Sequence, residues 1–233
     1  MTGPEQAGAA RASGCAPWVF GVVLLVALAA AGGCRGWKGT LPREGDLHPR
    51  LTPFTYLERG RLLALAADVR ATIEREDDPF VPLAVGIANR GLDRLTLTRE
   101  SFTLVDEQGR RYPLATIDEV REKMGNLVPI DLRISADFVS VFGSPWDLWQ
   151  RVPATFFPVL SVGSVPGFGP RTIRRDRVEL PRRSWMADLL YFPHPEGELA
   201  GRRFELWVDA EELDEPVFVK FAVRAMVRGR ERP

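Results

Sequence analysis

The chain has 233 residues, with 31 basic and 31 acidic side chains and therefore a formal net charge of zero. A dedicated nucleic-acid-binding protein usually carries a basic excess, so we expect no nucleic acid partner. Two cysteines and two histidines are too few for a disulfide framework or for a metal site built from those residues. We therefore expect no metal and no other cofactor.

An uncharged apolar run occupies residues 16–33, and its last residues, Ala30 to Gly33, are small. Cys34 follows directly. The run is shorter than a typical transmembrane helix and ends in small residues. This arrangement resembles the signal peptide and lipobox of bacterial lipoproteins, although Ala31 stands where that pattern prefers leucine.

The resemblance implies that residues 1–33 are a signal peptide and that a peptidase cuts before Cys34. The thiol and the new amino group of Cys34 would then carry acyl chains such as palmitate. The residue after Cys34 is Arg35 and not aspartate, which resembles the pattern of lipoproteins sorted to the outer membrane. The body would then face the periplasm. An uncleaved anchor and an ordinary secretory signal are the alternatives, and both also place the body outside the cytoplasm.

Residues 34–53 mix glycines, prolines and charges without periodicity, so we predict a flexible tether between the lipid anchor and the domain. The rest of the chain, residues 54–233, is long enough for one domain with a substantial core. The partners that follow from this organisation are the membrane, through the lipid, and a protein of the cell envelope.

Period-two alternation predicts strands through most of the domain. Residues 63–73 place apolar side chains at every odd position, although their alanine and leucine content leaves a helix open. Residues 80–89 carry Val81, Leu83, Val85 and Ile87 on one face. Further strands are expected around residues 95–97, 102–104, 177–180, 187–192, 203–208 and 217–227.

One short helix is marked by a capping box, in which Thr116 would be the N-cap and Glu119 the third helical residue. Val120 and Met124 follow at helical spacing, and Gly125 would end the helix. The acidic stretches 74–78 and 209–215 lack the spacing of a calcium loop, so we interpret them as solvated turns.

Two segments carry a second resemblance. Residues 80–113 run strand, Asn-Arg-Gly turn and strand, and residues 189–223 contain Leu-Leu-Tyr-Phe-Pro, Leu-Trp-Val and a hydrophobic last strand. Together they resemble the immunoglobulin-like β-sandwich domains of many bacterial lipoproteins. The resemblance implies a mainly β, immunoglobulin-like sandwich with one short helix, and it offers no shared catalytic residues.

The segment 138–170 interrupts this pattern as an apolar insertion that is rich in glycine and proline. Its charged residues are Asp147 and Arg151, and its many breakers argue against one long helix or strand. It either packs on the sandwich and completes the core, or forms an apolar surface for a partner or the bilayer. The contact residues on the second interpretation are Trp146, Trp149, Phe156, Phe157 and Phe168.

An arginine cluster follows the insertion. It could meet anionic headgroups or envelope polymers, with Arg171, Arg174 and Arg175 next to the insertion as contact residues. The alternative is a solvated strand edge, where charges block unwanted pairing. The further members of the cluster are Arg177, Arg182 and Arg183.

Catalytic residues are scarce in this sequence. His48 falls in the predicted tether, and His194 lies between two prolines, so neither marks a catalytic triad. We therefore predict a non-enzymatic envelope lipoprotein that serves as a binding or scaffolding module. A hydrolase that uses Asp or Glu on envelope polymers and a carrier of an apolar ligand are the alternatives.

Overall fold

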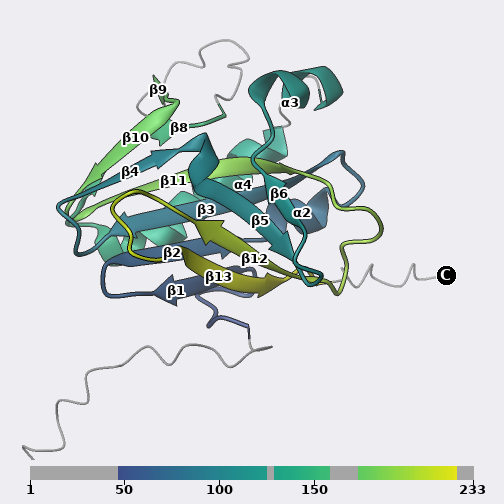
Figure 1. Cartoon of the computed structure of the whole chain (residues 1–233). Helices are drawn as coiled ribbons and strands as arrows, with labels where there is room; N and C mark the ends of the chain where they lie inside the picture. The colour runs from purple at the N-terminus through teal and green to yellow at the C-terminus, as the bar shows by residue number, and fades with distance from the viewer. Residues whose placement is uncertain (1–46, 125–128, 158–172, 225–233) are drawn as a thin grey trace, which may run out of the picture. The chain divides into compact units, whose positions relative to one another are not determined.

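A computed structural model describes residues 47–124, 129–157 and 173–224 (Figure 1). The predicted signal peptide, Cys34 and most of the predicted tether lie outside the described residues, and so does the second half of the insertion.

Two β-sheets form the core (Figure 1). The large sheet has the order β1–β2–β3–β11–β7 and is antiparallel except for the β11–β7 pair. The small sheet has the order β13–β12–β5–β6 and is antiparallel throughout. The large sheet contains β1 (Thr55–Arg59), β2 (Leu63–Asp68), β3 (Phe80–Asn89), β7 (Gln150–Arg151) and β11 (Ser184–Pro193). The small sheet contains β5 (Phe102–Asp106), β6 (Arg111–Pro113), β12 (Arg203–Val208) and β13 (Val217–Ala222).

The inner faces of the two sheets meet in an apolar core. The rings of Tyr56 in β1 and Phe221 in β13 lie 6.2 Å apart, and the Tyr56 hydroxyl donates to the carbonyl of Ala222 at 3.3 Å. Inward-facing residues of the small sheet, such as Leu206 and Val219, are fully buried. The prediction of a mainly β sandwich is confirmed, and its immunoglobulin-like topology stays a prediction.

A separate strand pair forms the corner between the sheets. β4 (Arg94–Thr98) pairs with β10 (Arg177–Pro181). This ladder adjoins the β3–β11 ladder, because β4 follows β3 and β10 precedes β11 in the sequence. Asn89 fixes the bend, because its side-chain amide donates to the carbonyls of Leu92 and Leu180. β4 then leads through the short helix η1 (Arg99–Ser101) into the small sheet, as strands do where they change sheets.

The outer face of the large sheet is covered by α4 (Pro129–Gly143), so β3 is buried along its whole length. Gly86 allows this contact, because a Cβ atom there would lie 2.6 Å from the Phe142 ring. Gly143 has the same role at the helix end, where a Cβ would lie 2.6 Å from the Trp185 ring. The helix can therefore approach the sheet only because these two positions carry no side chain.

The predicted helix is confirmed as α3 (Ile117–Met124), and its capping box is formed. The Glu119 carboxylate accepts from the backbone nitrogen of Thr116 at 2.7 Å, and the Thr116 hydroxyl accepts from the backbone nitrogen of Glu119 at 3.2 Å. Within the described residues, however, there are three α-helices and not one, because α2 and α4 are also present.

The predicted strand 63–73 is wrong in its second half, where α2 (Arg70–Glu74) replaces it. Asp68 causes the change of direction, since its carboxylate accepts from the backbone nitrogen of Arg70 at 2.9 Å and from the Thr55 hydroxyl at 2.5 Å. Such a side-chain contact to the following backbone turns the chain out of an extended conformation.

Residues 48–51, which we predicted to lie in the tether, contact the sandwich. His48 is 4% exposed, and its backbone nitrogen donates to the carbonyl of Lys220 in β13 at 3.1 Å. Arg50 forms a β-bridge with Tyr56 in β1. The folded domain therefore includes the chain at least from His48, and does not begin only at residue 54.

Candidate functional site

The first half of the insertion belongs to the core. In α4, the Phe138 and Phe142 rings stack with their centroids 5.7 Å apart. Phe142 also contacts Trp146, in η2 (Ser144–Trp146), and Trp185 of β11, at centroid distances of 6.4 and 6.0 Å. These contacts support the interpretation that the insertion packs on the sandwich.

Three predicted contact residues are therefore buried. Trp146, Phe156 and Phe157 are 9%, 1% and 4% exposed. Phe156 packs edge-on against Phe102 of the small sheet, and Phe157 against Tyr191, at 5.4 and 5.1 Å. Aromatic side chains of this size stabilise the fold when they are buried, so they are unavailable to a partner. Of the other predicted contact residues, Trp149 is partly exposed and Arg175 is exposed, while Phe168, Arg171 and the Arg174 side chain lie outside the described residues.

The described part of the arginine cluster is solvated. Arg177 pairs with Glu179 at 3.5 Å, and Arg182 pairs with Asp93 at 3.0 Å. Arg183 adopts a positive φ of 58° in the turn between β10 and β11. These pairs at a strand end favour the interpretation of a charged strand edge.

A buried carboxylate attaches the insertion to the large sheet. Asp188 of β11 accepts hydrogen bonds from the backbone nitrogens of Phe156 and Leu189 at 2.7 and 2.9 Å. Its other neighbour is the hydroxyl of Thr155, 2.7 Å away, in β8 (Ala154–Thr155). β8 in turn pairs with β9 (Ile173–Arg174). Burial raises the pKa of Asp188 to about 7, against these hydrogen bonds and the charge of Arg99, which lower it.

The Thr155 hydroxyl connects Asp188 to the backbone of the insertion. The hydroxyl oxygen lies 2.7 Å from both the Phe157 carbonyl and Asp188 Oδ1, and it accepts from the Phe157 nitrogen at 3.0 Å. One hydroxyl proton can serve only one of those two oxygens. The hydroxyl can therefore donate either to Asp188 of β11 or to the Phe157 carbonyl within the insertion.

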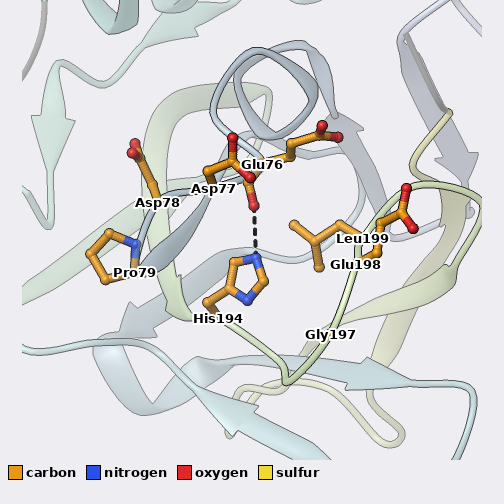
Figure 2. Close-up of a pocket in the computed structure, with 8 residues that line it drawn as sticks. All are labelled: Glu76, Asp77, Asp78, Pro79, His194, Gly197, Glu198 and Leu199. Carbon is orange, nitrogen blue, oxygen red and sulfur yellow. Dashed lines mark hydrogen bonds between the residues drawn. The ribbon is translucent and has the colours of Figure 1, made fainter.

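An acidic pocket of about 370 Å³ lies where the turn after α2 meets the loop after β11 (Figure 2). His194 lies on one wall, and its Nε2 is 2.9 Å from the backbone carbonyl of Glu76. This contact holds the two loops together. The pocket is lined by Glu76, Asp77, Asp78, Pro79, His194, Gly197, Glu198 and Leu199.

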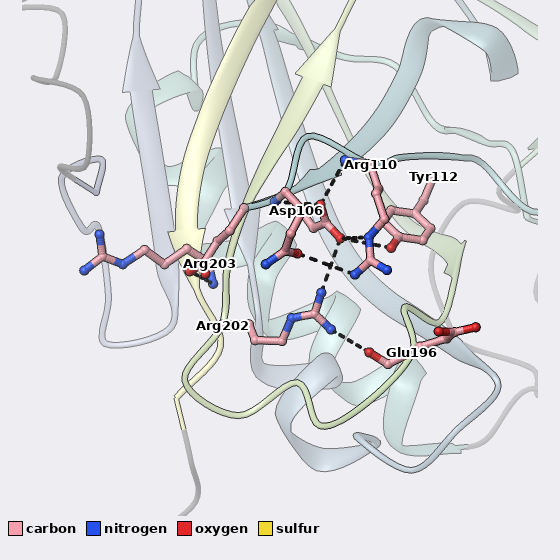
Figure 3. A network of polar contacts seen from close by, with 8 residues as sticks. Asp106, Arg110, Tyr112, Glu196, Arg202 and Arg203 are labelled. Atoms are coloured by element: carbon pink, nitrogen blue, oxygen red, sulfur yellow. Dashed lines mark hydrogen bonds and ion pairs between the residues drawn. The ribbon is translucent and has the colours of Figure 1, made fainter.

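A second buried carboxylate organises one end of the small sheet (Figure 3). The Asp106 side chain is fully buried and pairs with Arg110 at 2.7 Å and Arg202 at 3.3 Å, and it accepts from the Tyr112 hydroxyl at 3.0 Å. Arg202 also donates to the backbone carbonyl of Glu196 at 3.0 Å. Burial raises the pKa of Asp106. Hydrogen bonds from the backbone and side chain of Arg110, the Tyr112 hydroxyl and the Gln108 backbone outweigh burial and hold the pKa below its ordinary value. This network closes the β5–β6 turn.

The outer face of the small sheet carries an aromatic pair. Trp207 of β12 and Phe218 of β13 lie opposite each other in the ladder, with ring centroids 5.2 Å apart and planes inclined by 20°. Both are only partly buried. The Trp207 indole nitrogen donates to Glu205 at 2.7 Å, and Lys220 pairs with the other oxygen of that carboxylate at 2.9 Å.

This face was not predicted from the sequence, in which residues 203–208 and 217–227 indicate strands but not the side that a second sheet covers. The available signal was the alternation itself, since Leu206 and Val219 face the core and Trp207 and Phe218 therefore face outward. The partners of Asp188 lie about 30 residues away along the chain, so no local pattern could have indicated them.

In the described ranges, no three His, Cys, Asp or Glu side chains gather closely enough to hold a metal ion. Among the described helices, none is both long and apolar enough to cross a membrane.

Comparison with known proteins yields one similar solved structure. No protein-family model matches the sequence, and no curated relative matches it. The similar structure is that of ycdA from Bacillus subtilis, a candidate lipoprotein by its name, at 12% identity and a TM-score of 0.34. The alignment covers 71% of this chain and 38% of that one.

Proposed function

We propose that the chain is a lipoprotein of the bacterial cell envelope, held by lipid on Cys34, whose sandwich is a non-catalytic binding or scaffolding module. One observation carries the proposal, namely that the uncharged apolar run 16–33 leads through small residues directly into Cys34. The module would face the periplasm, and Arg35 favours the outer membrane as its residence.

The use of the buried carboxylates supports a non-catalytic role. Asp68, Asp106 and Asp188 are each bonded by donors of their own chain, and each joins two segments that are separate in the fold. A catalytic acid or base needs an atom within hydrogen-bond reach of its substrate. These three groups instead hold a helix start, a turn and the insertion.

Metabolic labelling with a fatty-acid analogue tests the anchor. Cys34→Ser should lose the label and accumulate as uncleaved precursor, because the acylated thiol is gone. Cys15→Ser is the matched control, since it removes the other cysteine of the chain and should keep both label and cleavage. Label retained in the Cys34→Ser protein would contradict the proposal.

A hydrolase acting on envelope polymers is the second candidate. The observation that favours it is the pocket of Figure 2, which is lined by His194 and by acidic residues of two loops. The test is incubation of the purified protein with isolated peptidoglycan, beside a His194→Ala variant. Release of soluble fragments by the wild-type protein, and its loss in the variant, would replace the binding-module proposal with the hydrolase.

A further inference from the structure

The chain enters the domain at a fixed place beside β13 and β1. The Lys220 backbone nitrogen donates to His48 Nδ1 at 2.8 Å, and the His48 nitrogen donates to the Lys220 carbonyl at 3.1 Å. His48 Nε2 lies 3.1 Å from Glu58 of β1, and the Leu57 nitrogen donates to the Pro49 carbonyl at 2.9 Å. These bonds attach the entering chain to the edges of both sheets.

The distance available to a lipid anchor is therefore short. His48 is 14 residues beyond Cys34 (48 − 34). Fourteen residues span at most roughly 50 Å when fully extended, and about 20 Å on average as a flexible coil. A lipid on Cys34 would therefore keep the β1–β13 edge within roughly 50 Å of the membrane.

The aromatic pair adjoins this entry point. The His48 ring meets the Phe218 ring edge-on, with centroids 5.8 Å apart. Phe218 in turn stacks on Trp207, so the two partly exposed rings continue from the entry point across the outer face of the small sheet.

The charged side chains on this face give it a positive excess. Its outward rows carry three cationic side chains and, with Glu107 directly after β5, two carboxylates, an excess of one positive charge. Lys220 neutralises Glu205 at 2.9 Å, and the Arg111 guanidinium lies 5.4 Å from the centre of the Trp207 ring. The cationic side chains are Arg111, Arg203 and Lys220, and the acidic ones are Glu205 and Glu107, which accepts from the Arg203 nitrogen at 2.9 Å.

Tryptophan rings with neighbouring cations match the chemistry of a membrane surface. Trp residues are enriched where headgroups meet the acyl region, because the ring is apolar and its N–H is polar. Lys and Arg are attracted to anionic headgroups. A weak contact of this kind becomes effective when a lipid holds the domain nearby, since tethering raises the effective concentration of the second contact.

We propose that the outer face of the small sheet, centred on Trp207 and Phe218, rests on the anionic headgroups of the bilayer that holds the Cys34 lipid. This inference depends on the proposed lipid anchor. It gives the domain one orientation, with the small sheet toward the membrane and α4 on the side away from it.

The test uses the lipidated full-length mature protein, reconstituted into vesicles of neutral phosphatidylcholine or of phosphatidylcholine with phosphatidylglycerol. Because Cys34 is the only cysteine after residue 33, one added cysteine takes a polarity-sensitive fluorophore. Thr103→Cys places the label opposite Trp207 in the ladder, and Ser140→Cys in α4 is the matched control. We expect a blue shift of the residue 103 label on anionic vesicles, reversed by high salt, and none at residue 140.

A second variant keeps the inference falsifiable. Trp207→Ala with Lys220→Ala should lose the blue shift of the residue 103 label, while far-UV circular dichroism shows that the sheet is still formed. An unchanged shift in this variant would overturn the assignment of the face. A shift of the same size on neutral vesicles would overturn the role of anionic headgroups.

The remaining outcomes separate this inference from the anchor. Vesicle flotation reports in the same samples whether the lipid holds the protein. A protein that floats but shows no shift at residue 103 would overturn the inference and leave the proposed function standing. Failure to float would contradict the lipid anchor itself. A shift seen only with native membrane vesicles would overturn the lipid contact in favour of a protein partner.

Discussion

Two aromatic-rich regions of this molecule differ in how deeply their rings are buried. In the first half of the insertion, Phe142 of α4 and Trp146 of η2 are buried, whereas Trp207 and Phe218 remain partly exposed on the small sheet. Both regions combine tryptophan with phenylalanine, so composition does not separate them. What separates them is whether a second layer of structure covers the sheet face that carries the rings.

Whether a helix can cover a sheet face depends on the side chains that the face presents. α4 approaches β3 because Gly86 leaves room for the Phe142 ring. The small sheet presents no such depression, since β12 and β13 place Glu205 and Lys220 beside the aromatic pair. A charged pair of this kind favours water or a polar partner over a packed helix.

The largest expected effect is that of Phe142→Ala. It removes a fully buried ring that contacts three other aromatic rings, so transfer and cavity terms add to about 3–5 kcal/mol of lost stability. Phe218→Ala is the matched change on the exposed face and should lower stability by about 1 kcal/mol or less. Urea denaturation of both variants measures the contrast, and equal losses would contradict it.

Asp188→Asn should remove a pH dependence of stability. Because the pKa of Asp188 is raised from 3.8 to about 7, the folded chain keeps a proton in that range that the unfolded chain releases. The free energy of unfolding therefore falls as pH rises from about 4 to about 7, and this contribution is constant above. Between about pH 5 and about pH 8 the wild-type protein should lose roughly 2–3 kcal/mol more than the variant.

Denaturation at both pH values measures the Asp188 effect, because groups common to the two proteins cancel. The variant also loses an acceptor for the Leu189 nitrogen, which lowers its stability equally at every pH. Parallel pH profiles for the two proteins would refute the raised pKa of Asp188.

Within the insertion itself, Trp146 and Trp149 should differ although their rings are 4.7 Å apart. Trp146→Ala should cost about 2–4 kcal/mol, because the ring is buried but its indole nitrogen has no hydrogen-bond partner in the described structure to lose. Trp149→Ala should cost about 1 kcal/mol, since its ring is partly exposed. Thermal unfolding of the two single variants tests the order, which the contact interpretation of Trp146 would reverse.

The smallest effect is expected at Leu148, which is 93% exposed between the two tryptophans. Leu148→Ser should change stability by no more than about 0.5 kcal/mol, because the side chain buries almost no surface. The same urea titration measures it. A loss comparable to that of Trp146→Ala would show that a further part of the chain covers this tip.

The sequence indicated those elements whose signals are local. Alternation located β3 and β12, and the Thr116–Glu119 capping box located α3. α4 was missed, although Ile134, Phe138 and Phe142 follow one another at a spacing of four residues, as on one face of a helix. The glycines and prolines that begin at Gly143 obscured that spacing.

The candidate site was less predictable, for a physical reason. Whether Phe156 is core or surface depends on Asp188, about 30 residues later, which accepts its backbone hydrogen bond. Whether His48 lies in a tether depends on a hydrogen bond to Lys220, which is near the other end of the domain in the sequence. Contacts between such distant residues leave no mark on the local pattern of either partner.

The long β3–β11 ladder has a consequence for how the protein matures. Its paired residues are separated by 95 positions at Asn89–Ser184 and by 113 at Phe80–Pro193. The centre of the large sheet cannot close until nearly the whole domain is available, and such distant pairing is slow. If the chain is exported as a lipoprotein precursor, as proposed, with its N-terminus first, it would stay open during passage and close its core only after β11 had emerged.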